Sequence, residues 1–582
     1  MTTDERARSS DAAVPRDGPA AWEGPVTYPA DTQGLNLFVL DRNLRRLLAR
    51  RAPDLIARFG GALEAFGAWA GGPLAAQASY TDRYAPPRLE PFGPDGSRLG
   101  RVVLNPDYVR CHAEAYRRGS VGLAFAADPA PHLLSFVMGY LLSESDISIH
   151  CPVTMTGAVA YVLDRIAPAQ MRDTYLPELV RMDGRATSGA TWATELHGGS
   201  DVGATTTRAT ADGDAWRLIG LKWFTSNAGA GLALATARPD GAPAGAGGLG
   251  CYLVPAELPD GVANRLWVRR LKEKVGTRGL PTGELELDGA WALEVAPPPH
   301  GLKAMMEALA YSRIHNAVGA AALQRRALLE AVCWATHRRA FGNAIRAYPM
   351  VRDTLLDLAM EQEASTALAF EAAVAFDAAL ADEAGRPWLR AVTALAKYHT
   401  AEQAVRAATR AVELVGGNGY TEDWPTARLY RDALVTAVWE GPANIQALEL
   451  VRAVAGKLPG DQAFLERVAA VAESLPSGLG EPAGMLWQAV TECRSALTYL
   501  RKHRADGPRL AARLMKLLAN TLGLALLLEE AAADLAAGDG RKALIAERFL
   551  ATRFGARSAI DGGRDSAQAH FDAVIEYARI QP

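Results

Sequence analysis

Cysteine is scarce in this sequence, and the spacing of the few cysteines excludes two kinds of site. The 582 residues include five cysteines, namely Cys111, Cys151, Cys251, Cys333 and Cys493. An odd, scattered set without a C-x-x-C pair supports neither a disulfide framework nor a zinc site. The sequence therefore suits a reducing cytosol, and we expect a cytoplasmic protein with no bound metal.

Long hydrophobic runs and a strong net charge are also missing. No segment approaches about 18 uninterrupted apolar residues, so no membrane-spanning helix is expected. Residues 1–30 contain acids and prolines but no apolar stretch, so we do not expect a signal peptide. The 62 basic and 65 acidic residues give a net charge of −3, which provides no global attraction to nucleic acid or anionic membranes.

Helical periodicity is what the sequence has in abundance. Apolar residues recur every three or four positions from residue 35 onward, as amphipathic helices require. The apolar segment 132–166 predicts buried helices that break near Pro152, and 86–100 is expected to be a connecting loop. Long helices rich in Ala and Leu are predicted near 301–338, 350–384 and 387–416, and again at 510–538.

The periodicity changes near Thr187. Short, partly alternating segments separated by Gly, Asp, Asn or Pro indicate antiparallel strands joined by tight turns. Helices followed by strands and more helices predict an α+β protein with an inserted antiparallel, barrel-like sheet domain. The expected parts are a flexible tail (1–33), a helical N-terminal domain (34–185), a β-domain (186–298), a helical bundle (299–456) and a helical extension (457–582).

Glu440 is the strongest candidate for chemistry. It lies between Val438-Trp439 and Gly441-Pro442, where poor solvation would raise the pKa of its carboxyl toward neutrality. Such a group acts as a base, although a glutamate in a mixed segment is more often a cap or a surface charge. Two glycines upstream, Gly416 and Gly417, would let the backbone approach a planar or phosphorylated ligand closely, because no Cβ intrudes.

The block from Gly416 to Glu440 resembles the C-terminal signature of the acyl-CoA dehydrogenase flavoproteins. In that family a GG-x-G-[FY] turn precedes a glutamate followed by glycine. The resemblance implies FAD as cofactor, Glu440 as the base that removes an α-proton from an acyl thioester, and hydride transfer to the flavin. It also implies a homotetramer, a dimer of dimers, with cofactor sites shared across subunits.

Two further motifs carry the resemblance into the expected β-domain. Thr194 to Asp201 is similar to the family's T-E-P-x-x-G-S-D loop, with Leu196 in place of the proline. The family implies flavin contacts for Thr194, Gly199 and Ser200. The stretch Gly220 to Asn227 resembles the strand along the flavin, so Phe224 would pack on the ring and Ser226 would bond it, although an aromatic residue in a strand is otherwise usually core.

Two more matches lie in the expected bundle domain. Residues 338–342 resemble the family's R-x-x-F-G, which implies that Arg338 reaches the cofactor of a neighbouring subunit and that Phe341 belongs to the cofactor set. Gly416, Gly417 and Asn444 complete the implied cofactor set. Pro442 departs from the family, which usually has Thr or Ser there, so the hydroxyl contact at that position is missing.

Several details point to the AidB-like, or adaptive-response, branch of this family. They are Cys151-Pro152 with Thr154-Met155-Thr156, Thr206-Thr207-Arg208-Ala209, Pro349 with Arg352, and Trp439-Glu440-Gly441. This branch adds a rival function, a DNA-binding role in the alkylation response. A second rival is a flavin monooxygenase or N-hydroxylase of the same fold, but such members often lack the glutamate.

A basic cluster in the expected C-terminal extension is the discriminator for DNA binding. It comprises Arg494, Arg501, Lys502, Arg504, Arg509, Arg513 and Lys516, with Asp506 the one acid between its ends. Such a cluster tracks phosphates if it faces a duplex, but charge runs are more often a solvated helix face. We therefore expect at most weak, sequence-independent DNA binding. The sequence does not identify the acyl chain or its carrier, CoA or a carrier protein.

Overall fold

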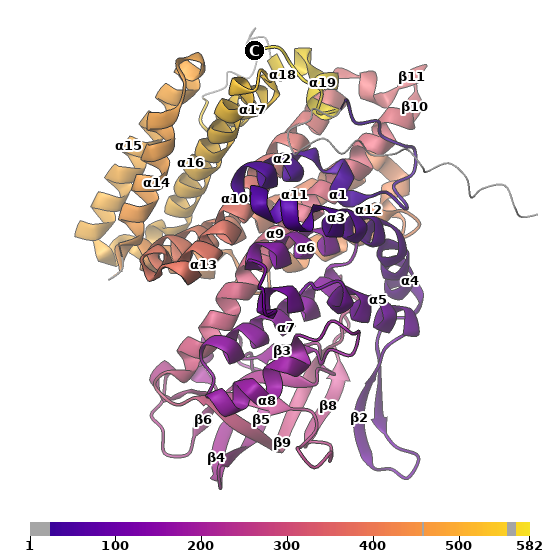
Figure 1. The fold of residues 1–582 in the computed structure, drawn as a ribbon, viewed down its shortest axis with the longest axis vertical. Helices are drawn as coiled ribbons and strands as arrows, with labels where there is room; N and C mark the ends of the chain where they lie inside the picture. Colours follow the sequence, from indigo (N-terminus) through magenta and orange to yellow (C-terminus); the bar gives the residue numbers. More distant parts are fainter. Residues whose placement is uncertain (1–23, 457–458, 556–565) are drawn as a thin grey trace, which may run out of the picture.

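The computed structural model describes residues 24–456, 459–555 and 566–582. Helices make up most of the chain, and a β-sheet lies at one end of the long axis (Figure 1). The first 23 residues of the expected flexible tail lie outside the described part. Its remainder is packed: Val26 and Tyr28 are buried, and the Tyr28 hydroxyl donates to the carbonyl of Ile575 at 2.9 Å.

The N-terminal part is a layer of helices with one strand pair. Its helices are α1 (Leu37–Leu40), α2 (Arg42–Arg51), α3 (Pro53–Trp69), α4 (Ala75–Tyr84), α5 (Pro106–Arg117), α6 (His132–Ser143), α7 (Ile147–Arg165) and α8 (Ala169–Leu179). A π-helical turn, Ala70–Leu74, joins α3 to α4. The apolar helix α6 is buried along its whole length, because it lies between α7 and the long helices of the bundle.

The prediction of a connecting loop over 86–100 is wrong. β1 (Arg88–Phe92) and β2 (Arg98–Val103) form an antiparallel hairpin that lies against the β8 strand of the main sheet. The turn is closed by the Gly93 amide, which donates to the Ser97 carbonyl at 2.8 Å, while Gly96 adopts φ +80°. Gly93, Pro94 and Gly96 form the hairpin's tip, whereas Pro91 and Gly100 lie within the strands themselves.

The helix break expected at Pro152 is also misplaced. The chain breaks earlier, at Glu144 to Asp146, where the Asp146 side chain caps α7 by accepting from the Ser148 amide at 2.8 Å. Proline has no N–H to donate to the carbonyl four residues before it. The Tyr108 hydroxyl donates to that carbonyl, on Ser148, at 3.2 Å, so α7 continues through Pro152.

The middle region forms the sheet. Its strands are β3 (Gly189–Trp192), β4 (Arg208–Asp212), β5 (Ala215–Ser226), β6 (Leu232–Pro239), β7 (Gly250–Pro255), β8 (Leu266–Leu271) and β9 (Thr282–Ala296). The strand order is β3-β6-β4-β5-β9-β7, and an additional β6–β7 pairing closes a ring of five strands, as a barrel-like sheet requires. Most pairs are antiparallel, but β3–β6 and β4–β6 are parallel, so the sheet is mixed.

Three long helices follow at the expected places. The bundle comprises α9 (Gly301–His337), α10 (Pro349–Ala381), α11 (Arg386–Val415), α12 (Pro425–Thr436) and α13 (Ala443–Ala455). A two-residue hairpin, β10 (Arg339–Ala340) with β11 (Asn343–Ala344), separates α9 from α10. Alanine and leucine line the contacts between these helices, and α9 is buried along most of its length.

The C-terminal part is helical as expected. It consists of α14 (Gly460–Ser474), α15 (Gly480–Lys502), α16 (Gly507–Ala536), α17 (Arg541–Arg553), α18 (Ser566–Ala569) and α19 (Phe571–Ile575). Single-turn helices elsewhere are Gly122–Phe125, Val202–Ala204, Ala246–Gly248, Ile345–Ala347, Glu383–Gly385, Gly416–Tyr420, Ser477–Leu479 and Arg504–Asp506. Helices α10 and Arg504–Ala536 are long and apolar enough to cross a membrane, but 72% and 67% of their most apolar windows are buried inside the molecule.

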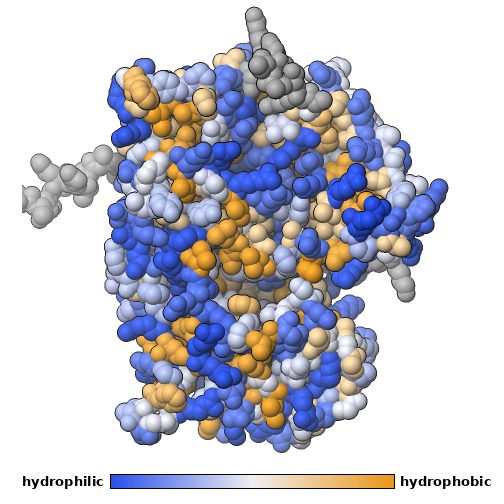
Figure 2. Space-filling model, turned by 180° about the vertical axis from the view of Figure 1, so that it is seen from behind, coloured by the Kyte–Doolittle hydropathy of each residue, from blue (hydrophilic) through white to orange (hydrophobic). Residues whose placement is uncertain are grey.

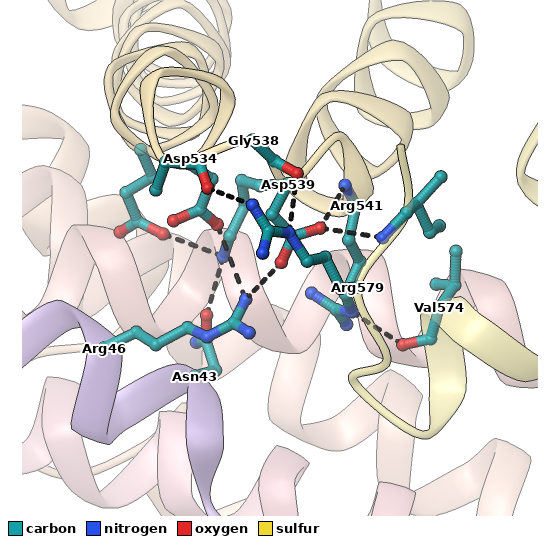
Figure 3. A network of polar contacts seen from close by, with 12 residues as sticks. Asn43, Arg46, Asp534, Gly538, Asp539, Arg541, Val574 and Arg579 are labelled. Atoms are coloured by element: carbon teal, nitrogen blue, oxygen red, sulfur yellow. Dashed lines mark hydrogen bonds and ion pairs between the residues drawn. The ribbon is translucent and has the colours of Figure 1, made fainter. Parts of the chain in front are cut away.

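A polar network fastens this C-terminal part to both the N-terminal helices and α10 (Figure 3). Arg46 donates to Asp539 at 3.0 Å, and Arg541 donates to the carbonyl of Val574 at 2.8 Å. Behind them, the fully buried Glu363 of α10 accepts from Arg541 at 2.6 Å and from Lys542 at 2.5 Å. The first and last helices are thus held on the bundle by paired charges.

Candidate active site

Glu440 occupies a strained turn between α12 and α13. Its backbone has φ +57° and that of Gly441 has φ +94°, so two successive residues are left-handed. For a residue with a Cβ this conformation costs roughly 1–2 kcal/mol. Glycine is favoured at position 441 by this φ, and a Cβ there would also displace the Gln446 amide group, 2.8 Å away.

Three side chains from three helices hold this turn through its carbonyls. Arg313 of α9 donates to the Glu440 carbonyl at 3.1 Å, and Lys397 of α11 donates to the Gly441 carbonyl at 2.7 Å. Gln446 of α13 donates to both carbonyls, at 2.8 and 3.1 Å. The turn is therefore fixed from its backbone, and the Glu440 side chain takes no part in holding it.

The Glu440 carboxyl group is buried and incompletely bonded. Its Oε2 atom is buried and has no hydrogen-bond partner among the described residues. Burial raises the pKa of this carboxyl to about 7, although the positive charges of Arg313 and Lys397 act in the opposite direction. A carboxylate with this pKa and an unpaired oxygen has the properties of a general base at neutral pH.

Other side chains lie close to the Glu440 turn. The Trp439 indole donates to the Asn316 side chain, which in turn donates to the Thr436 carbonyl at 3.1 Å. Burial and the nearby Glu440 charge raise the pKa of the Cys151 thiol to about 12, so Cys151 is protonated at neutral pH. Cys151 also lies near Lys274, whose pKa burial lowers to about 8.

Lys274 connects this pocket to the sheet. Its ammonium group donates to the Leu280 carbonyl at 2.6 Å and to the Thr282 hydroxyl at 3.0 Å. The hydroxyls of Thr282 and Ser226 are 3.4 Å apart. Ser226, at the end of β5, is therefore linked through Thr282 and Lys274 to the surroundings of Glu440.

The loop after β3 lies against the same strand. The Trp223 amide of β5 donates to the Thr194 carbonyl at 2.9 Å. Gly199 and Ser200 are exposed, and a Cβ on Gly199 would lie 2.5 Å from the Thr194 hydroxyl. Glycine is needed there because any larger residue would collide with Thr194.

A buried ion pair anchors this loop. Glu195 accepts from Lys222 of β5 at 2.9 Å and also from the amides and hydroxyls of Thr206 and Thr207. Burial alone would raise the pKa of Glu195, but Lys222 and the two hydroxyls lower it to about 2. The loop is held from beneath by a permanent charge pair, which leaves Thr194 and Ser200 free on its surface.

An aromatic surface borders the loop. Phe224 is 56% exposed, which is unusual for a phenylalanine in a strand, and it stands beside Trp223 with their rings 6.5 Å apart. The Lys272 ammonium lies 3.4 Å from the centre of the Trp223 ring. The exposed ring and the hydroxyl on β5 lie with the glycine loop after β3 on one surface, which suits a planar, phosphorylated cofactor. Thr194, Gly199, Ser200, Phe224 and Ser226 are therefore the candidates to contact such a cofactor.

The remaining expected cofactor residues lie elsewhere in the chain, with one exception. Arg338 caps the C-terminus of α9, 25 residues beyond Arg313 (338 − 313), which is about 37 Å along the helix axis. Phe341 is 95% exposed at the tip of the β10–β11 hairpin, and Gly416 and Gly417 follow α11 at the same end. Asn444 is the exception: it is exposed in the first turn of α13, four residues after Glu440.

A large cavity opens next to the residues that hold the Glu440 turn. It has a volume of about 950 Å³ and is lined by α7, α9, α10, α11 and α13, including Arg313 and Gln446. Its apolar lining includes Tyr161, Ile166, Met306, Phe376, Leu380 and Leu389. Its charged lining residues are Arg165, Lys303, Glu307, Arg313, Glu383, Arg386, Arg390, Glu449 and Arg452, so cations outnumber acids.

The basic cluster of the C-terminal part is exposed. Arg494, Arg501, Lys502, Arg504, Arg509, Arg513 and Lys516 all lie at the surface where α15 turns into α16. Arg501 is paired with Asp461, and Arg509 with Asp506 at 3.4 Å. The Tyr499 and His503 rings stack beside them, 4.4 Å apart.

Sequence reasoning missed Lys397, Gln446 and Asn316. Lys397 carried a usable signal, because it is a single lysine within the alanine-rich stretch ALAKYHT on the buried face of a long helix. A buried lysine needs a partner. Gln446 and Asn316 carried no such signal, because their partners are backbone carbonyls and an indole brought close only by the fold.

Family models match most of this chain in order. Residues 28–183 match the adaptive response protein AidB N-terminal domain, 190–290 the acyl-CoA dehydrogenase middle domain, and 299–455 the acyl-CoA dehydrogenase C-terminal domain. Two curated relatives are also similar over most of their length. Acyl-CoA dehydrogenase family member 11 of Caenorhabditis elegans is 33% identical over 74% of this chain and 72% of its own.

The second relative is the putative acyl-CoA dehydrogenase AidB of Escherichia coli K12, 30% identical over 74% of this chain and 80% of its own. Among solved structures, C. elegans ACDH-11 in complex with C11-CoA covers 99% of both chains with a TM-score of 0.84 and 26% identity. The apo form of Bd2924 covers 88% of this chain and 99% of its own, with a TM-score of 0.79 and 28% identity. The chain belongs to the acyl-CoA dehydrogenase family, in its AidB-like branch.

Proposed function

We propose that this protein removes two hydrogens from the Cα–Cβ bond of an acyl thioester, with FAD as cofactor and Glu440 as base. The carrying observation is the Glu440 carboxyl, which is buried, has one unbonded oxygen and has a pKa of about 7. It lies at a fixed turn next to a cavity of about 950 Å³. Arg313 and Gln446, which donate to the Glu440 carbonyl, line this cavity.

The cofactor would be held by groups of the sheet. Thr194, Gly199 and Ser200 present hydroxyls and open backbone, Phe224 presents an exposed ring, and Ser226 presents a hydroxyl. FAD, when bound, supplies the acceptor for the hydride that leaves the β-carbon. The Glu195–Lys222 pair keeps the loop in place whether or not the cofactor is bound, because both groups are buried beneath it.

Glu440 would take the α-proton of the thioester. The thioester carbonyl acidifies that proton, and a base with a pKa near the working pH combines an available charge with enough basicity. The backbone hydrogen bonds from Arg313, Lys397 and Gln446 direct the carboxyl without bonding its oxygens. Oε2 is thus left available for the substrate.

The cavity supports a thioester of CoA or of a phosphopantetheine arm. Its apolar walls suit an acyl or pantetheine chain, and its surplus of cations suits phosphate. Arg386 and Arg390 are already paired with Glu307 and Glu449, at 3.0 and 2.6 Å, whereas Arg165 and Lys303 make no ion pair with the described residues and would be available to an anion. The solved ACDH-11 relative holds C11-CoA.

We further propose a homotetramer in which one copy completes the cofactor site of another. Arg338, Phe341, Gly416 and Gly417 are too far from Glu440 to serve the same cofactor within one chain. Phe341, Tyr420 and Met350 are 95%, 86% and 84% exposed near that end of α9, and such side chains favour burial against a partner. Figure 2 also shows apolar side chains gathered across the middle of one face, around a hollow.

The test is anaerobic bleaching of the flavin. We expect purified protein to take up FAD and to lose its visible absorbance when mixed with a matching acyl thioester from a panel of CoA and phosphopantetheine esters. Glu492→Gln, an exposed site on α15, is the matched control for substitutions at Glu440. Failure to bind FAD would overturn the proposal, and flavin reduction by NADPH but by no thioester would favour a monooxygenase.

A further inference from the structure

The strained turn at Glu440 needs something to hold it. Two left-handed residues in succession have few stabilising contacts of their own, and Glu440 is not a glycine. Their two carbonyls accept hydrogen bonds from Arg313, Lys397 and Gln446, each on a different helix. The three donors differ in charge and burial, so their contributions are separable by mutation.

Lys397 is the most deeply buried cation among the three donors. It is 1% exposed, and its ammonium group lies 2.7 Å from the Gly441 carbonyl. That carbonyl is the one hydrogen-bond acceptor of Lys397 among the described residues, which is little compensation for burying an ammonium group. A buried charge of this kind persists where an opposite charge lies nearby, and the nearby opposite charge is Glu440.

We propose that Lys397 is a positioning residue for the base: it holds the strained turn through Gly441 and places a positive charge beside the Glu440 carboxylate. This inference rests on the proposed function, because it assumes that Glu440 is the base. Lys397 touches neither the cofactor strand nor the bulk of the cavity, so its effect on chemistry passes through Glu440.

The charged groups around Glu440 define what Lys397 adds. Arg313 faces it from α9, Lys397 from α11, and Cys151 from α7, with Lys274 beyond Cys151. Burial raises the pKa of Glu440, and Arg313 and Lys397 are the two groups that lower it. Burial lowers the pKa of Lys397 to about 8, so at pH 7 most of the lysine is charged while Glu440 is ionising.

Gln446 provides an internal comparison. Its amide donates to the same two carbonyls but carries no charge. Replacing it removes the mechanical part of the support and leaves the electrostatic part. Replacing Lys397 removes both parts, so the difference between the two variants isolates the charge.

The experiment compares Lys397→Met, Lys397→Arg and Gln446→Met with the wild type. One readout is the pH profile of flavin reduction by an acyl thioester. The other is independent of activity: infrared titration of the protonated carboxyl band in the apoprotein, assigned by its loss in Glu440→Gln. Thermal unfolding identifies any variant that fails to fold.

For Lys397→Met we expect both titrations to shift upward by about one pH unit, as loss of one nearby opposite charge predicts. At pH 7 the reduction rate should then fall about fivefold below the wild type, as the ionised fraction drops from about a half to about a tenth. Lys397→Arg should restore the wild-type titration, and Gln446→Met should slow reduction at every pH without moving the titration.

An unshifted Glu440 titration in folded Lys397→Met would overturn the inference, as would an equal shift in Gln446→Met. The outcome is separable from the proposed function. If no thioester reduces the wild-type flavin, the proposed function fails, but the infrared titration of Glu440 still decides whether Lys397 acts on it.

Discussion

Two glutamates with buried carboxylate oxygens in this protein have opposite properties. Glu363 of α10 is fully buried, and its two oxygens accept from Arg541 and Lys542 at 2.6 and 2.5 Å. Burial would raise the pKa of Glu363, but these two cations lower it to about 2. Glu440 is half-buried as a residue, but its Oε2 atom is buried without a partner among the described residues, and burial raises its pKa to about 7.

The difference lies in where the neighbouring cations point. Around Glu363 they bond the carboxylate itself, so the charge is permanent and serves to attach α17 to α10. Around Glu440, Arg313 and Lys397 bond the backbone carbonyls and act on the carboxyl only through space. Burial therefore produces a structural anchor in one place and a group able to exchange a proton in the other.

Neutralising Glu440 should have the largest effect on the reaction. We expect Glu440→Gln to bind FAD normally and to slow flavin reduction by a thioester about 10²–10⁴-fold, the usual contribution of a general base. Anaerobic stopped-flow absorbance measures the rate. An unchanged rate, with Glu492→Gln as control, would place the base elsewhere.

Neutralising a partner of Glu363 should instead affect stability. Arg541→Met leaves Glu363 buried with one cation fewer, and breaking a buried pair in this way costs about 3–5 kcal/mol. We expect a lower thermal midpoint and a lower denaturant midpoint, with unchanged flavin reduction per folded molecule.

Arg579→Met is the matched control in the same network (Figure 3). Arg579 is exposed and bonds only the carbonyls of Gly538 and Ala537. Its loss should cost no more than about 0.5–1.5 kcal/mol per hydrogen bond. Equal destabilisation by the two variants would show that burial of Glu363 is not what matters.

The two glutamates should also respond to pH in different ranges. Flavin reduction should rise about tenfold per unit up to pH 7, where Glu440 ionises, and level off above it. Glu363 has a folded-state pKa below its unfolded value of about 4.3, so its stabilisation is present above that pH. It is lost as the pH falls toward about 2. Rate profiles and unfolding at a series of pH values measure the two effects.

The smallest expected effect is weak DNA binding by the exposed basic cluster of the C-terminal part. The seven cations near the α15–α16 turn are solvated, and Arg501 and Arg509 already have acidic partners. If about half of them reach phosphates, DNA binding should weaken with salt with a log–log slope near −3, at about −0.9 per contact. Charge reversal of Arg501, Lys502 and Arg504 should abolish it without changing the flavin spectrum. A gel-shift titration that shows salt-resistant or sequence-specific binding would contradict this.

The sequence predicted what depends on local pattern. The long bundle helices follow from their Ala and Leu periodicity, and Glu440 stood out because of its Trp-Glu-Gly setting. The Pro152 prediction was wrong because the hydroxyl that compensates for the proline comes from Tyr108, in another helix. The prediction of a loop over 86–100 was wrong because its turn-forming residues occur in two short strands, whose packing against β8 depends on the rest of the fold.

The candidate site divides in the same way. Thr194, Phe224 and Ser226 come from motifs that are contiguous in sequence, and their assignment to FAD stays a prediction. Lys397 could not be connected to Glu440 from the sequence, because its acceptor is a carbonyl 44 residues away. Nor does a one-dimensional pattern show that Arg338 lies far along α9 from Glu440.

The pairing of Arg46 with Asp539 has a consequence for how the chain is made. The two residues are 493 positions apart. At ~5–20 residues per second, the basic helix α2 leaves the ribosome roughly 25–100 seconds before its acidic partner is synthesised. During that interval Arg46 lacks this partner, so the Arg46–Asp539 pair forms only when the last helices have been synthesised.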